Sequence, residues 1–197
     1  TIFSKLAGKS EAKEITVRAS IIAKYTHLVR DLVNTPPSHL YPETFTKKLT
    51  ADVKAAGGAK VGLKVTIWDE KQLKSQGFGG IIGVGQGSAN PPRLMHISYT
   101  PKAKNVKRFA FVGKGITFDT GGLNLKPGLG MEAMKCDMSG AAAVCAATLA
   151  IAELGLPVAI ECWAPLAENM PSDTATRPSD VITIFGGKTV EVLNPDA

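Results

Sequence analysis

The sequence predicts an α/β fold, a mixed β-sheet flanked by helices. Helical periods and β-prone runs alternate along most of the 197-residue chain, an order typical of a sheet with helices on its faces. Residues 139–154, SGAAAVCAATLAIAEL, are apolar on nearly every side, which predicts a buried helix. The composition, with 44% hydrophobic and 20% charged residues, is that of a globular chain with one substantial core.

The first half of the chain contains two clear helical patterns. Apolar residues recur every three or four positions from Glu11 to Val33, which predicts an amphipathic helix ending near Asn34. A second pattern opens at Pro42 and is stopped by Gly57-Gly58. The further expectations for this half are a strand over 60–68, a short helix over 69–76 and a glycine-rich stretch over 77–87.

The second half is richer in β-type runs. Gly155 and Pro157 end the alanine-rich helix. Gly186-Gly187 separates two short runs, 181–185 and 189–193, which predicts a β-hairpin. The other predicted strands are 93–99, 108–112 and 158–163.

Composition also bears on location and partners. The chain has no run of eighteen apolar residues and no readable secretory signal, so we expect no membrane span and a cytoplasmic protein. Three cysteines without a CxxC pair argue against a disulfide framework. The formal charge of +6 comes from scattered lysines without interleaved aromatic residues, so we do not expect a nucleic-acid partner.

Residues 112–140, VGKGITFDTGGLNLKPGLGMEAMKCDMSG, form the candidate site. This segment combines many glycines with Lys114, Asp119, Lys126 and Asp137 and has no clean helical or strand period. Glycines let a backbone approach a ligand closely, and loops on rigid scaffolds commonly carry catalytic groups.

Two other chemistries fit this segment poorly. Residues 128–133 match the dinucleotide fingerprint G-x-G-x-x-A, but Lys126-Pro127 precedes them where a strand is required. Nucleophilic catalysis needs a base beside a serine or cysteine, and the three histidines, His27, His39 and His96, are scattered over unrelated elements.

Metal-assisted chemistry remains, since it requires several carboxylates converging on one cavity. Asp119 and Asp137 provide two, and Asp196, just beyond the predicted hairpin, is a third candidate. A lysine can serve such a site as an ammonium that stabilises a developing oxyanion, or as a neutral amine that binds the metal. The residues alone leave open which of Lys114 and Lys126 has which role.

Several separated segments together resemble the leucine aminopeptidase family, the cytosolic dinuclear-metal aminopeptidases. The resemblance covers the chain from about Arg30 to its end. It rests on RDLVNTPPSHLYPETF, GFGGIIGVGQGSANPPRL, VGKGITFDTGGLNLKP, MKCDMSGAAAV and ENMPSDTATRPSDVITIFGGKTVEVLNPDA. It implies a peptidase that releases N-terminal amino acids, often leucine, from peptides by means of two divalent cations. Zinc or manganese is expected, with magnesium or cobalt as alternatives, and the complete family members are homohexamers.

The resemblance also implies a role for each candidate residue. Lys114 and Asp137 would bind one metal ion, Asp196 the other, and Asp119 both. Lys126 would be the catalytic ammonium. In addition, Met134 would line the pocket for the N-terminal side chain, and Asn194 would lie near the departing residue.

The chain departs from the family pattern at its end. The family motif continues past Ala197 with a metal-bridging glutamate and an arginine that holds a bicarbonate, and Pro195 replaces a threonine. We therefore expect residues 1–34 to be a linker helix and residues 35–197 to be the first part of an incomplete C-terminal catalytic domain, weakly active by itself. The alternative is a non-catalytic scaffold or DNA-binding member of the same family.

Overall fold

The computed structural model describes residue 5 and residues 8–197. A five-stranded mixed sheet forms its centre, and its longest strand, β5 (Val158–Asn169), has neighbours on both edges. On one edge β5 pairs antiparallel with β2 (Arg93–Tyr99), which pairs antiparallel with β1 (Leu63–Trp68). On the other edge β3 (Lys107–Val112) and β4 (Gly115–Asp119) pair with β5 one after the other, both parallel to it.

The pairing of β4 with β5 contains a β-bulge. Ile116 lies opposite Ala167, whereas Asp119 lies opposite Asn169, so three steps along β4 correspond to two along β5. Thr117 is therefore the additional residue, and it shifts the register by one position.

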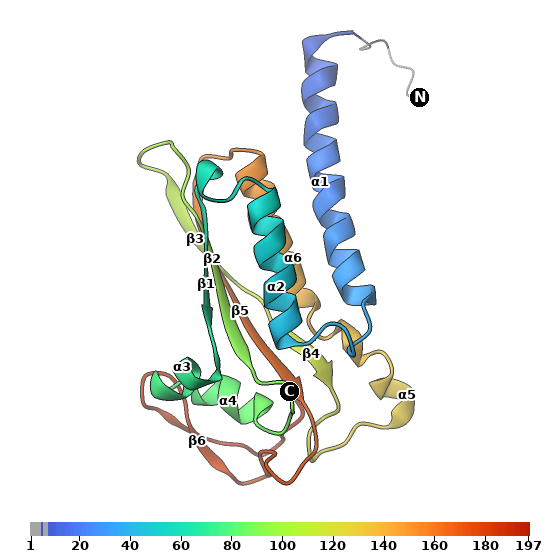
Figure 1. Ribbon diagram of the computed structural model, residues 1–197, viewed down its shortest axis with the longest axis vertical. Coiled ribbons are helices and arrows are strands. Elements are labelled where there is room, and N and C mark those ends of the chain that lie inside the picture. Colours follow the sequence, from blue (N-terminus) through green and yellow to red (C-terminus); the bar gives the residue numbers. More distant parts are fainter. Residues whose placement is uncertain (1–4, 6–7) are drawn as a thin grey trace.

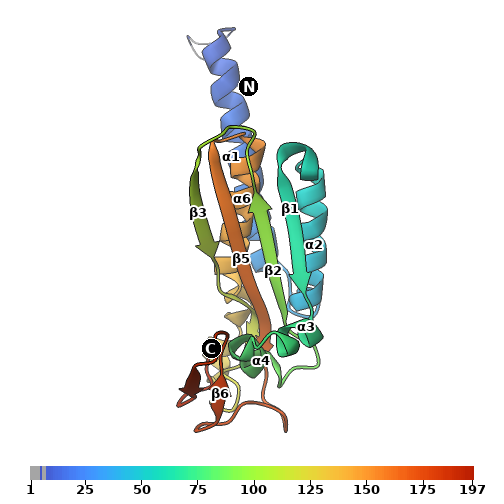
Figure 2. The same ribbon diagram turned by 90° about the vertical axis from the view of Figure 1, so that its left-hand side faces the viewer.

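Three long helices cover one face of the sheet: α1 (Ser10–Asn34), α2 (Pro42–Ala55) and α6 (Ser139–Glu153). Figure 2 shows the opposite face of the sheet toward the viewer, with the helices behind it. Large side chains of both layers are fully buried between helices and sheet, among them Phe45, Leu49, Ile97, Leu149 and Ile160. This core fixes the position of β5, whose end carries part of the candidate site.

Helix α1 is anchored mainly through its second half. Its buried residues are Tyr25 and Leu32, while the first half extends beyond the sheet (Figure 1). The Tyr25 hydroxyl donates a hydrogen bond of 2.6 Å to the Glu153 carboxylate at the end of α6, and Lys24 forms an ion pair of 2.7 Å with the same carboxylate.

An aromatic cluster lies on the sheet face opposite the helices. Because side chains alternate along strands, Trp68, His96 and Trp163 project away from the core. The His96 ring stacks on Trp163 with centroids 4.0 Å apart, and the two tryptophan rings are 5.8 Å apart.

Several short elements complete the fold, and most of them surround the end of the sheet near Asp119 and Asn169. They are the 3₁₀ helix η1 (Gly58–Val61), α3 (Glu70–Ser75), α4 (Gly79–Gly85), α5 (Gly128–Met131), the 3₁₀ helix η2 (Met134–Cys136) and the hairpin of β6 (Val181–Thr183) and β7 (Thr189–Glu191). Of these, η1 lies apart, at the other end of α2.

Most predicted elements are confirmed, including the first two helices, the buried helix and the hairpin. The strand predicted over 60–68 begins only at Leu63, since Gly62 takes a φ of 89° after the 3₁₀ turn. The strand predicted over 158–163 continues to Asn169. The two glycine-rich stretches are more ordered than expected, because they contain α4 and β4.

Two other expectations concern residues at the start and middle of the chain. The predicted linker, residues 1–34, includes residues 1–4, 6 and 7, which lie outside the described part. Within that part, the segment Gly128–Glu153 has the length and hydropathy of a membrane span. It is divided into α5, η2 and α6, and α6 packs on β5 and α1, which is typical of a core helix.

Candidate metal centre

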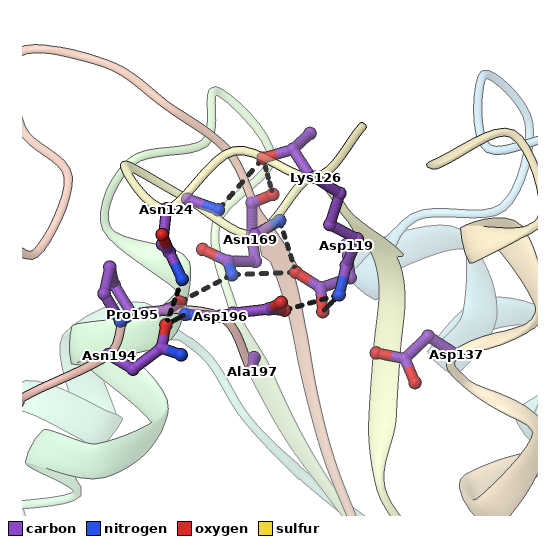
Figure 3. Close-up of polar contacts among 12 residues, drawn as sticks. Asp119, Asn124, Lys126, Asp137, Asn169, Asn194, Pro195, Asp196 and Ala197 are labelled. Atoms are coloured by element: carbon purple, nitrogen blue, oxygen red, sulfur yellow. Dashed lines mark hydrogen bonds and ion pairs between the residues drawn. The ribbon is translucent and has the colours of Figure 1, made fainter. Parts of the chain in front are cut away.

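The candidate site lies where β4 and β5 end side by side. Carboxyl ends of parallel strands commonly deliver functional side chains. Asp119 is the last residue of β4, and Asn169 the last of β5. The segment 194–197 returns to this point, so that Lys126 and Asp196, 70 positions apart in sequence, meet (Figure 3).

Lys126 links two of the predicted carboxylates. Its Nζ lies 2.5 Å from Asp196 Oδ1 and 3.4 Å from Asp119 Oδ2. The Asp119 side chain is 1% exposed, whereas Lys126 and Asp196 are partly accessible. The loop holds Lys126 here because its backbone N–H donates to the carbonyl oxygen of Thr120, which closes the turn after β4.

Lys114 forms a second group with Asp137. The Lys114 Nζ lies 2.9 Å from Asp137 Oδ1 and 2.7 Å from Asp137 Oδ2, and it donates a further hydrogen bond of 2.7 Å to the carbonyl oxygen of Ala197. Lys114 follows β3, and Asp137 follows η2 just before α6. The structure thus places the five predicted charged residues in two adjacent ion-paired groups.

Two carboxylate oxygens in these groups are buried without a hydrogen bond, Asp119 Oδ2 and Asp137 Oδ2. Each lies within ion-pair distance of a lysine Nζ, but neither contact has hydrogen-bond geometry. A buried anionic oxygen without a donor is costly unless a cation compensates it. Both oxygens are therefore suited to accept a metal ion.

The carboxylates alone do not provide enough ligands for a metal ion. Within residue 5 and residues 8–197, no group of three or more His, Cys, Asp or Glu side chains is arranged to hold a metal ion. A divalent cation bound here would need a donor besides these carboxylates, and the lysines paired with them are the candidates. Oxygen and amine donors of this kind suit Mn²⁺, Zn²⁺, Mg²⁺ or Co²⁺.

Burial and ion pairing shift the pKa values of Asp137, Lys126 and Asp196. Burial raises the pKa of Asp137, and the hydrogen bond from Lys114 only partly offsets this effect. The hydrogen bond between Lys126 and Asp196 raises the pKa of the lysine and lowers that of the carboxyl. Lys126 is therefore a stable ammonium at neutral pH, as a role in stabilising negative charge requires.

The two predicted substrate-binding residues lie in different segments, Asn194 in the segment 194–197 and Met134 in η2. Asn194 is exposed, and its Oδ1 accepts hydrogen bonds from Asn124 Nδ2 at 2.8 Å and from the Asp196 N–H at 2.9 Å. Met134 is half-buried at the start of η2, which packs against β4. Asn194 is thus directly connected to the charged groups, whereas Met134 lies on η2, three residues before Asp137.

Sequence reasoning missed Asn169, the residue at the centre of Figure 3. Its side chain donates to Asp119 Oδ1 at 2.8 Å and to the carbonyl oxygen of Pro195 at 2.9 Å. The available signal was its position at the end of a β-prone run, but the predicted strand stopped six residues earlier.

Residues 27–197 match the profile described as "Cytosol aminopeptidase family, catalytic domain", and the chain belongs to the cytosol aminopeptidase family.

Named relatives agree with this assignment. The chain is 57% identical over 196 residues to a probable cytosol aminopeptidase of Streptomyces coelicolor, covering 98% of the chain and 37% of the relative. It is 54% identical over 187 residues to that of Rhodococcus jostii, covering 95% of the chain and 36% of the relative. The chain thus spans just over a third of the length of these relatives.

Solved structures show the same fold. The bottromycin maturation enzyme BotP in complex with Mn matches with a TM-score of 0.86 and 36% identity, over 99% of this chain and 43% of that one. Leucyl aminopeptidase from Trypanosoma brucei in complex with bestatin matches with a TM-score of 0.86 and 41% identity, over 91% of this chain and 34% of that one.

Proposed function

We propose that the protein, at its native length, is a metal-dependent aminopeptidase that releases N-terminal amino acids, preferentially leucine, from peptides. One observation carries the proposal: two lysines and three aspartates from distant parts of a cytosol aminopeptidase chain converge at the ends of β4 and β5. The matched leucyl aminopeptidases support the substrate class.

Two divalent cations, zinc or manganese with magnesium or cobalt as alternatives, are the proposed cofactors. Lys114 and Asp137 hold one cation, Asp196 holds the other, and Asp119 contacts both. The Mn complex of BotP supports a metal of this kind, as do the buried oxygens of Asp119 and Asp137 that accept no hydrogen bond. Lys114 must lose its proton to act as a ligand, so metal binding releases a proton there.

Bound cations of this type supply an activated water and stabilise negative charge on a carbonyl oxygen. Lys126 adds a donor that the protein itself contributes. Its raised pKa keeps it charged, and its partly exposed Nζ can donate a hydrogen bond to the carbonyl oxygen of the scissile peptide bond. Met134 lines the pocket for the N-terminal side chain, and Asn194 lies near the departing residue.

The family also suggests a cellular location, an oligomeric state and partners for the native-length protein. The name of the relatives supports a cytoplasmic location. By the family resemblance, the native-length protein is a homohexamer that acts on peptides, with bicarbonate at the active site. The expectation of no membrane or nucleic-acid partner rests instead on the composition, with its scattered lysines and its lack of a run of eighteen apolar residues.

Hydrolysis of leucine p-nitroanilide with added Mn²⁺ tests this function. We expect Lys126→Ala to lower kcat by about 10²–10³-fold, the typical effect of removing one donor to a developing oxyanion. Lys135→Ala is the matched control, because Lys135 lies in the same segment but donates to the carbonyl oxygen of Asn34. An unchanged kcat in Lys126→Ala would refute the catalytic assignment, and no hydrolysis by the unaltered protein would refute the function.

A further inference from the structure

Asn169 joins two parts of the proposed centre that are far apart in sequence. Its amide nitrogen donates to Asp119 Oδ1 at 2.8 Å and to the carbonyl oxygen of Pro195 at 2.9 Å. A side-chain amide has two N–H donors, so both are in use and the orientation of the group is fixed. Asn169 is only 4% exposed, and Figure 3 shows it between Asp119 and Pro195.

The first hydrogen bond determines how Asp119 is presented. Its Oδ1 accepts from Asn169 and also from the backbone N–H of Gly121 at 2.9 Å. Its Oδ2 has no hydrogen bond and faces Lys126 at 3.4 Å. With one oxygen held by two donors, the other oxygen is the one directed toward the charged groups.

The second hydrogen bond positions the segment that carries Asp196. Because Pro195 immediately precedes Asp196, holding the Pro195 carbonyl limits where the next carboxylate can lie. In this arrangement Asp196 Oδ1 lies 2.5 Å from Lys126 Nζ. One amide therefore acts on two of the proposed metal-binding carboxylates.

The β-bulge at Thr117 makes this arrangement possible. Continued without the bulge, the pairing that sets Ile116 opposite Ala167 would set Asp119 opposite Met170, a thioether in place of an amide. The one-residue shift places Asp119 opposite Asn169, where the two side chains are neighbours on adjacent strands. The backbone carbonyl of Asn169 further accepts from the Thr120 N–H at 3.0 Å and hydroxyl at 2.8 Å, which fixes the two strand ends together.

We propose that Asn169 is a positioning residue of the metal centre, whose amide holds Asp119 and the Pro195–Asp196 segment in the arrangement that binds divalent cations. The inference rests on the proposed function, because it assigns metal binding to Asp119 and Asp196. It goes beyond that function in naming the group that orients the ligands. Hydrogen-bonding partners of metal ligands typically change metal affinity by 10–100-fold when they are removed.

Calorimetric titration of the metal-stripped, native-length protein with Mn²⁺ tests the inference without relying on activity. We expect Asn169→Leu to weaken Mn²⁺ affinity by about 10–100-fold. The matched control is Asn90→Leu. Asn90 Nδ2 donates at 3.0 Å to Glu168, the neighbour of Asn169 in β5, so this variant also loses an amide–carboxylate hydrogen bond but outside the centre. Asn90→Leu should bind Mn²⁺ as the unaltered protein does.

The outcomes separate this inference from the function on which it rests. Native Mn²⁺ affinity in Asn169→Leu, with a melting temperature lowered as in Asn90→Leu, would show a structural role only and overturn the inference. An unaltered protein that binds no Mn²⁺ would instead overturn the metal centre itself. If Asn169→Leu does not fold, Asn169→Ser serves the same purpose, because a serine can donate only one hydrogen bond, and native affinity in that variant would equally overturn the inference.

Discussion

Gly121 shows how strongly a single position constrains the candidate centre. It lies two residues after Asp119, takes a φ of 89°, and donates its N–H to Asp119 Oδ1. A Cβ at this position would overlap the carbonyl oxygen of Asn124, a backbone atom that cannot move aside easily. Any other residue would be strained both by its own dihedral angles and by this contact.

We therefore expect Gly121→Ala to lower the free energy of unfolding by about 1–3 kcal/mol, measured by urea denaturation. Gly130→Ala is the matched control in the same glycine-rich segment, because nothing lies within 4 Å of a Cβ placed there. A Gly121→Ala variant as stable as Gly130→Ala would contradict the geometry of the turn.

At the residue scale, the sequence allowed most of the centre to be predicted, but not all of it. Lys114, Asp119, Lys126 and Asp137 stand out because charged side chains are unusual among so many glycines. Asn169 has no such signal, since its importance depends on a bulge that places it opposite Asp119. A one-residue change in register leaves no trace in residue composition.

At the scale of elements, a polar cluster of Lys24, Tyr25 and Glu153 adds to the apolar contact between α1 and α6. Burial raises the pKa of Glu153, but the hydrogen bonds from Lys24 and Tyr25 outweigh it, so the pKa lies below its usual value of 4.5. A carboxylate with a lowered pKa in the folded state stabilises the fold above its unfolded pKa, and this contribution is lost as the pH falls below that value.

Tyr25→Phe removes the buried hydroxyl of this cluster while keeping the ring. We expect it to lower the melting temperature at pH 7 by an amount equivalent to about 1 kcal/mol, the usual net contribution of an intramolecular hydrogen bond to stability. The difference from the unaltered protein should shrink as the pH falls below 4.5, the usual pKa of a glutamate, and Glu153 becomes protonated. A difference that is constant across this pH range would show that the cluster does not act through the carboxylate.

A helix or strand could be predicted from the sequence when its hydrophobic pattern extended over many residues. The 25 residues of α1 contain several turns of apolar repeat, and its predicted end is confirmed. The five residues of β4 begin with glycine and end with the buried Asp119, so that only three β-prone residues remain to indicate a strand. Pro165 interrupts the run that would have shown the full length of β5.

At the scale of the whole molecule, metal binding should stabilise the fold. The proposed ligands come from Lys114 just before β4, from Asp119 at the end of β4, from Asp137 just after η2, and from the segment 194–197. A cation held among them therefore connects parts that only tertiary structure brings together. A ligand that binds only the native state stabilises it by about 2.7 kcal/mol at one hundred times its dissociation constant.

We expect Mn²⁺ to raise the melting temperature of the native-length protein and EDTA to reverse the increase, as measured by calorimetry. Asp119→Asn should abolish the response to Mn²⁺, because the substitution removes the charge of the most buried proposed ligand. The control is Asp52→Asn, since Asp52 is a surface partner of Lys48 on α2. A response that persists in Asp119→Asn would place the metal elsewhere.

The aromatic cluster on the exposed side of the sheet gives the protein an optical reporter of its own. The chain contains two tryptophans, and both lie in this cluster, with rings 5.8 Å apart. Tryptophan emission therefore follows the joining of β1, β2 and β5 and carries no direct signal from α1. Comparing emission with far-ultraviolet circular dichroism, which reports on the helices, would show whether the two layers of the molecule melt together or in succession.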